Sequence, residues 1–87
     1  MNTIELYTGK GCSACVTLKE RLLELGITNY EPRSTDVMEH RDAIMHLGFR
    51  SIPVLVKRDT DGEVLGFMNG NAMCDTTLTN FFKEGEV

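Results

Sequence analysis

Two cysteines with two residues between them, Cys12 and Cys15, are the groups in this chain best suited to covalent chemistry. Thiols at this spacing at the start of a helix can close a small disulfide ring without large distortion of the backbone. The positive end of a helix also stabilises the thiolate of the first cysteine, and the thiolate is the form that attacks disulfides. The pair therefore predicts redox chemistry.

Cys12 is the predicted nucleophile because it lies at the helix entrance, whereas Cys15 extends the apolar stripe of that helix. An exposed helix N-terminus stabilises a nearby thiolate by about 0.3–1 kcal/mol. This is less than the roughly 1.4 kcal/mol that would lower the pKa of the Cys12 thiol by one unit. Backbone N–H groups of Ala14 and Cys15 and the positive charge of Lys10 are expected to add to it. We therefore expect the pKa of the Cys12 thiol to lie below its ordinary value of about 8.5.

The predicted reaction begins when the Cys12 thiolate attacks a substrate disulfide and forms a mixed disulfide. Cys15 then attacks the sulfur of Cys12, which releases the reduced substrate and leaves a Cys12–Cys15 disulfide. This cycle requires no metal and no organic cofactor.

Hydrophobic patterning predicts the elements that position the pair. An alternating strand over residues 3–7 is followed by a glycine-containing loop and a helix over residues 13–25, which Gly26 ends. A second strand is expected over residues 27–33, where Pro32 lacks a backbone donor and favours a sheet edge. The expected inner stripe of the helix is Cys15, Leu18, Leu22 and Leu25.

The second half of the chain predicts four further elements. Ser34, Thr35 and Asp36 offer N-caps for a second helix, which Gly48 ends. Residues 53–56 are continuously aliphatic, as in a central strand. A hairpin turn over residues 59–62 leads to a strand over residues 63–67, and a polar turn over residues 69–71 precedes a last helix. The expected inward faces of these two helices are Val37, Ile44 and Leu47, and Leu78, Phe81 and Phe82.

The element order is thus strand, helix, strand, helix, strand, strand, helix, in one α/β domain over residues 1–87. The first two strands should be parallel and the last two antiparallel, in a four-stranded mixed sheet with three helices covering both faces. This order is similar to the smallest thioredoxin-like architecture.

Composition limits the function classes. A formal charge of −4 argues against nonspecific binding to nucleic acid or an anionic membrane, because both need excess Lys and Arg. No apolar run approaches the roughly 20 residues of a membrane helix, and the first residues lack an export signal. The three cysteines are an odd number, unlike the paired framework of a secreted mini-protein. We therefore expect a cytoplasmic monomer.

The chain resembles the glutaredoxin family over nearly its whole length. The resemblance rests on residues 4–8 leading into Cys12-Ser13-Ala14-Cys15, on Lys19, and on Ser51-Ile52-Pro53-Val54. It is closest to the small glutaredoxin-like redoxins that reduce ribonucleotide reductase, because residues 48–56 look like their segment before the third strand. It implies disulfide-containing protein substrates, ribonucleotide reductase among them. Glutathione, as reducing co-substrate, or a flavin-dependent thioredoxin reductase would return the electrons.

The resemblance also implies that Pro53 follows a cis peptide bond and lies against the two-thiol loop. An ordinary X-Pro bond is cis in only about 5–6% of folded cases, so the residues alone favour trans. The resemblance to glutaredoxins further implies that Ile52 and Pro53 hold an extended substrate by a strand-like contact, which Ser51 supports. Lys10, Ser13 and Ala14 complete the expected substrate-binding set around the thiols.

Cys74 has two interpretations. Its spacing to the apolar residues of the last helix favours a place in their inner stripe. Alternatively, Cys74 and Asp75 resemble the glutaredoxin pair that holds the γ-glutamyl end of glutathione. The paired glycines usual before that pair are absent, residues 67–73 look like an insertion, and Lys10 is one place nearer the first thiol than the usual lysine.

Two other function classes stay open. Cys12 and Cys15 supply half of a four-thiolate zinc site or of a dimer-bridged iron–sulfur site, although no second matched pair is present. The second of these classes is a purely structural disulfide or an interaction adaptor on the same fold, which a reducing compartment disfavours. His40 and His46 are expected on a solvated helix surface rather than as metal ligands.

Overall fold

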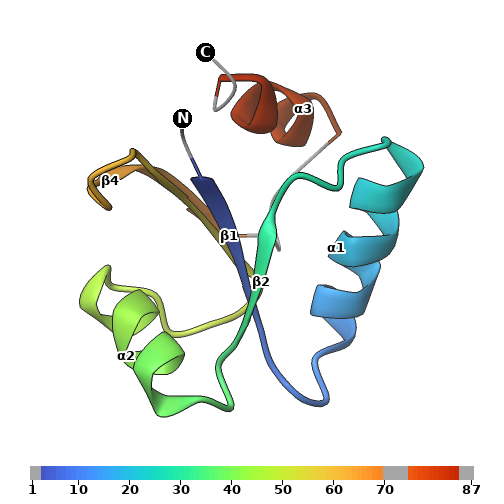
Figure 1. Ribbon diagram of the computed structural model, residues 1–87. Coiled ribbons are helices and arrows are strands. Elements are labelled where there is room, and N and C mark those ends of the chain that lie inside the picture. The colour runs from blue at the N-terminus through green and yellow to red at the C-terminus, as the bar shows by residue number, and fades with distance from the viewer. Residues whose placement is uncertain (1–2, 70–74, 85–87) are drawn as a thin grey trace.

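The structure is a computed structural model, and it describes residues 3–69 and 75–84. Its elements follow the expected order (Figure 1). The strands are β1 (Thr3–Thr8), β2 (Glu31–Ser34), β3 (Val54–Arg58) and β4 (Val64–Asn69), and the helices are α1 (Ser13–Glu24), α2 (Met38–His46) and α3 (Asp75–Glu84).

The sheet has the order β2-β1-β3-β4. β1 pairs with β2 in parallel and β3 pairs with β4 antiparallel, as expected. β3 also pairs antiparallel with β1, which joins the two pairs into one mixed sheet. Tyr7 pairs with Val54, and Val54 pairs in turn with Asn69. The C-terminal end of β1, the N-terminal end of β3 and the C-terminal end of β4 therefore lie side by side at the same end of the sheet.

Helices cover both faces of the sheet, as predicted: α1 and α3 lie on one face and α2 on the other (Figure 1). The larger core joins Ile4, Leu6 and Leu55 of the sheet to both helices of the first face. Its helical members are Leu18, Leu22, Leu78, Phe81 and Phe82. The smaller core, under α2, contains Tyr7, Ile44, Val54 and Val56. Alternate residues of β3 thus face opposite helix layers, which explains its continuous burial.

The second strand is shorter than predicted, because residue 27 caps α1 instead of pairing in the sheet. Gly26 has a positive φ of 73° and its N–H donates to the Leu23 carbonyl at 3.0 Å. The N–H of Ile27 donates to the Leu22 carbonyl at 2.8 Å. These two bonds form a Schellman cap, in which glycine avoids the steric cost of the left-handed conformation. β2 begins only at Glu31 and lies at the sheet edge, where Pro32 was expected.

The predicted caps of α2 are wrong in detail. Val37 is the N-cap and has no side-chain capping bond. Ser34 Oγ instead accepts the N–H of Asp36 at 3.3 Å, and the Thr35 N–H donates to the Thr8 carbonyl at 2.7 Å. Thr35 is therefore pulled inward and buried against the end of β1.

Three other boundaries or faces also differ from the prediction. Leu25 and Val37, expected on inner faces, are 37% and 46% exposed. β4 runs on through Asn69, so residues 67–69 are strand rather than the start of an insertion or a polar turn. The rest of that predicted turn and insertion lies outside the described residues.

Candidate functional site

Cys12 is the N-cap residue of α1, and its sulfur accepts the capping hydrogen bond that a serine or threonine oxygen accepts at other helix starts. Its backbone is extended, with φ −92° and ψ 103°, and its Sγ accepts the N–H of Cys15 at 3.1 Å. An N-cap side chain satisfies one of the four N–H groups that a helix leaves unpaired. Of the two N–H groups that were predicted to donate to this sulfur, that of Cys15 does so. No hydrogen bond from the Ala14 N–H to the sulfur is found in the described structure.

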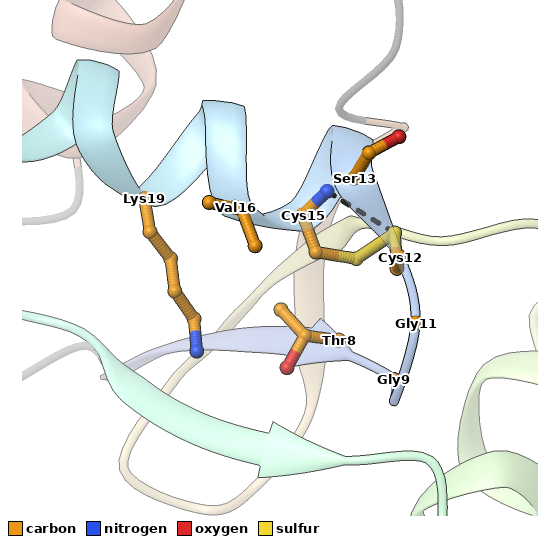
Figure 2. Close-up of a pocket in the computed structure, with 8 residues that line it drawn as sticks. All are labelled: Thr8, Gly9, Gly11, Cys12, Ser13, Cys15, Val16 and Lys19. Atoms are coloured by element: carbon orange, nitrogen blue, oxygen red, sulfur yellow. Dashed lines mark hydrogen bonds between the residues drawn. A yellow bond between two sulfur atoms is a disulfide. The ribbon is translucent and has the colours of Figure 1, made fainter.

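Cys12 and Cys15 form a disulfide, with their Cα atoms 5.3 Å apart (Figure 2). Cys15 is only 3% exposed, whereas Cys12 is half-buried. The two sulfurs therefore differ in access, as the position of each along the helix predicts. A substrate can reach Cys12, and Cys15 lies behind it.

The segment before β3 approaches the same sulfur. The Ile52–Pro53 peptide bond is cis, as the resemblance implied. The carbonyl oxygen of Ile52 lies 3.9 Å from Cys12 Sγ, and Pro53 is fully buried. Residues forty positions apart in sequence are thereby brought into one site.

Two contacts hold this segment in place. Asn69 Nδ2, at the end of β4, donates to Ser51 Oγ at 2.8 Å. On the other side, Gly9 packs so closely that a Cβ there would lie 2.6 Å from Ile52 Cδ1 and 2.8 Å from Thr35 Oγ1. The cis-proline segment is thus fixed between the loop after β1 and the last strand.

A cavity of about 300 Å³ opens beside the disulfide (Figure 2). The sequence prediction did not assign Thr8, Val16 and Lys19 to the site, yet all three line this cavity. Lys19 follows Cys15 by one helical turn, which places both on one helix face and was the signal available in the sequence. Its side chain extends from α1 toward β1 and Thr8 (Figure 2).

The other predicted substrate-binding residues lie in different surroundings. Ser13 lines the cavity, although its hydroxyl points away from the sulfurs (Figure 2). Ala14 is half-buried, and Lys10 is exposed and does not line the cavity. Asp75 is the first residue of α3. Cys74 lies outside the described residues, so its two interpretations stay predictions.

The resolved pKa shifts lie away from the thiols, in a polar cluster on the α2 face of the sheet. Burial raises the pKa of Tyr7, whose hydroxyl donates to Glu5 Oε1 at 3.0 Å. The hydrogen bond to Glu5 raises the pKa of Arg58, whose Nε lies 2.7 Å from the same oxygen. Arg33 Nε lies 3.4 Å from the other carboxylate oxygen of Glu5. Glu5 therefore forms ion pairs with two guanidinium groups, and Glu31 forms a further pair with Arg33.

The two histidines lie in different surroundings. His40 is half-buried rather than solvated, with Nδ1 3.0 Å from the Ser34 carbonyl and its ring edge-on to Tyr7. His46 is exposed. Within residues 3–69 and 75–84, no group of three or more His, Cys, Asp or Glu side chains could hold a metal ion. Likewise, no helix in these ranges is long and apolar enough to cross a membrane.

Comparison with solved structures identifies the fold. The thioredoxin-like protein BC3987 is 26% identical with a TM-score of 0.58, over 95% of this chain and 99% of that chain. A mutant thioredoxin from Halobacterium salinarum is 21% identical with a TM-score of 0.66, over 95% and 73%. Thioredoxin from Malassezia sympodialis is 13% identical with a TM-score of 0.74, over 99% and 76%. Models of protein families and curated protein sequences give no match.

The chain therefore has a thioredoxin-like fold that carries a pair of cysteines able to form a disulfide. The structural neighbours named above are thioredoxins or thioredoxin-like proteins. The narrower resemblance to glutaredoxins stays a prediction from the sequence. What the geometry offers is one accessible sulfur at a helix start, a second buried sulfur behind it, and a backbone carbonyl beside the first.

Proposed function

We propose that this protein is a thiol–disulfide oxidoreductase that reduces disulfide substrates with Cys12 and Cys15. The observation that carries the proposal is the asymmetry of the pair. Cys12 Sγ is accessible, accepts the Cys15 N–H at 3.1 Å and lies 3.9 Å from the Ile52 carbonyl, whereas Cys15 is 3% exposed. Of these two sulfurs, Cys12 Sγ is the one that a large substrate can meet, and Cys15 Sγ is close enough to resolve the product.

The reaction transfers two electrons from the dithiol to the substrate disulfide. The Cys12 thiolate attacks one substrate sulfur, the substrate S–S bond breaks, and the leaving thiolate takes up a proton. Cys15, once deprotonated, then attacks Cys12 Sγ and breaks the mixed disulfide. The second substrate thiolate leaves and is protonated, and the protein disulfide remains.

The N–H of Cys15 stabilises the Cys12 thiolate from which the attack begins. A hydrogen bond to a charged acceptor is roughly twice as strong as one between neutral groups. The bond from Cys15 N–H therefore favours the Cys12 thiolate before attack. The same bond favours Cys12 Sγ as the leaving group in the reverse of this step, in which the released substrate thiolate attacks the substrate sulfur of the mixed disulfide and charge develops on Cys12 Sγ.

Cysteine variants test the assignment. Cys15→Ser should accumulate a mixed disulfide with the substrate, because attack still occurs and resolution does not. Cys12→Ser should lose both turnover and adduct. Mass spectrometry of proteolytic peptides locates the adduct on Cys12 rather than on Cys74, which both variants retain. Turnover by Cys12→Ser at the wild-type rate would disprove the proposed roles.

The source of electrons forms a second part of the proposal. The sequence resemblance suggests either glutathione or a flavin-dependent thioredoxin reductase, and the structural neighbours named above include thioredoxins. We propose that one of these two reduces the Cys12–Cys15 disulfide and that ribonucleotide reductase is among the acceptors. A side-by-side turnover assay with the two reductants, with ribonucleotide reductase as acceptor, distinguishes them. Failure of both to support turnover would reject this part.

A further inference from the structure

A second cavity, of about 350 Å³, lies on the α2 side of the cis-proline segment. We call it the Arg41–Arg50 groove. Ile44, Phe49 and Ile52 line it with apolar surface, and the guanidinium-bearing side chains of Arg41 and Arg50 line it as well. Ile52 belongs to both sites, because its side chain lines the groove while its carbonyl lies 3.9 Å from Cys12 Sγ. A molecule bound at Cys12 that extends past Ile52 therefore enters the groove.

Both arginines are exposed, and within residues 3–69 and 75–84 neither takes part in an ion pair. This differs from Arg33 and Arg58, which form ion pairs with Glu5 and, for Arg33, with Glu31 as well. The chain as a whole has a formal charge of −4, so two cations lining one groove stand against the general charge of the protein. Such local charge favours an occupant of the opposite sign.

Local structure fixes where these side chains lie. Arg41 and Ile44 are three residues apart on α2 and thus share a helix face. α2 ends in a Schellman cap, in which Gly48 has φ 93° and the Phe49 N–H donates to the Ile44 carbonyl at 3.1 Å. This cap turns the chain back over Ile44 and brings Phe49 and Arg50 into the groove. Phe49 also packs edge-on against Phe67, with ring centroids 5.1 Å apart.

We propose, building on the oxidoreductase function above, that this groove docks an acidic segment of a protein substrate beside its disulfide. Carboxylates would pair with Arg41 and Arg50, and an apolar side chain would lie against Ile44 and Phe49. A polypeptide fits because it can place carboxylates and apolar side chains along one extended chain. At about 3.3 Å per residue, the docked segment lies within a few residues of the attacked cysteine.

Matched peptides test the proposal. One disulfide-linked peptide carries Glu on both sides of its cysteine, and a second carries Gln at the same positions. The wild-type protein should show a higher kcat/KM for the Glu peptide, and the ratio should fall as ionic strength rises. In the Arg41→Gln/Arg50→Gln variant the ratio should fall by about three- to tenfold, as expected for two exposed charge pairs. Arg21→Gln removes one positive charge in α1, on the opposite face of the sheet, and should leave the ratio unchanged, whereas the single variants Arg41→Gln and Arg50→Gln, each an equal charge change, should each lower it.

A binding measurement separates this proposal from the oxidoreductase function. A Cys12→Ser/Cys15→Ser protein should still bind a cysteine-free Glu peptide more tightly than its Gln counterpart, even if the wild type proves inactive. Reduction of bis(2-hydroxyethyl) disulfide, which carries no charge, reports the oxidoreductase function alone. Equal affinity for the two peptides would overturn acidic docking. So would a loss of the preference for the Glu peptide in Arg21→Gln as large as the loss in the Arg41 and Arg50 variants. An arginine-dependent preference for glutathione disulfide over the Glu peptide would overturn the assignment to a polypeptide.

Discussion

Replacing Gly9 by alanine tests whether close packing of the loop after β1 holds the cis-proline segment against Cys12. The new Cβ would lie 2.6 Å from Ile52 Cδ1 and 2.8 Å from Thr35 Oγ1. Carbon atoms pack best at about 3.5–4.0 Å, so the first contact is about 1 Å too short. Thr35 is buried and its N–H is bonded to the Thr8 carbonyl, so it cannot easily withdraw. Ile52, which is half-buried, is the group that must move.

Overpacking of this kind costs about 1–3 kcal/mol of unfolding free energy. In a domain of this size, each kcal/mol lowers Tm by about 4–8 °C. The Ile52 carbonyl lies 3.9 Å from Cys12 Sγ, so we expect displacement of this residue to lower kcat/KM for disulfide reduction together with stability. Urea unfolding and the peptide-disulfide assay measure the two effects separately.

Two controls make the prediction specific. Gly66→Ala places a Cβ 3.8 Å from Phe81, an ordinary contact, and should leave both stability and kcat/KM close to wild type. Ile52→Val removes the Cδ1 atom, so adding it to Gly9→Ala should recover part of the loss, with a coupling of at least about 0.5 kcal/mol. A Gly9→Ala protein as stable and active as Gly66→Ala would refute the packing argument.

Two further predictions concern groups around the site and the sheet. The pKa of Tyr7 is raised in the folded protein, so its stabilising contribution is complete below the unfolded value of 10.0 and is lost as pH rises through the folded value. Unfolding free energy measured in urea should therefore fall more steeply above pH 10 for wild type than for Tyr7→Phe, and equal slopes would contradict this. Asn69→Ala removes the bond to Ser51 and should raise KM for a peptide disulfide severalfold while costing about 1 kcal/mol of stability or less. Asn80→Ala, at an exposed position on α3, is its control, and an equal rise in KM there would count against the role given to Asn69.

The parts of the fold that the sequence predicted are those that depend on local patterning. The inner stripe of α1 contains Leu18 and Leu22, which recur one turn apart, and both are buried as their spacing predicted. The strand that begins after Pro53 was recognised from its aliphatic run. Ile27 shows where patterning fails. It is apolar and β-branched, as in a strand, yet its N–H completes the cap of α1 and its side chain joins the larger core.

The site was predictable where one segment carries it and unpredictable where segments distant in sequence meet. The accessible Cys12 and buried Cys15 followed from their places along one helix. The contact of Gly9 with Ile52 and Thr35 joins three segments, and nothing in the pattern of any one of them indicates it. The same holds for Arg41 and Arg50. Each is an ordinary surface arginine in the sequence, and only the cap at Gly48 brings them to one groove.

The position of Cys12 explains why one fold can hold the pair in both redox states. As N-cap, its sulfur accepts the Cys15 N–H in the disulfide form, with the donor and acceptor three residues apart on one helical turn. Reduction breaks the S–S bond but removes neither the donor nor the acceptor, and it adds negative charge to the acceptor when the thiolate forms. The cap should therefore strengthen on reduction. The helix start can then stay in place through the cycle, so Ile52 and the Arg41–Arg50 groove present the same surface to a substrate before and after electron transfer.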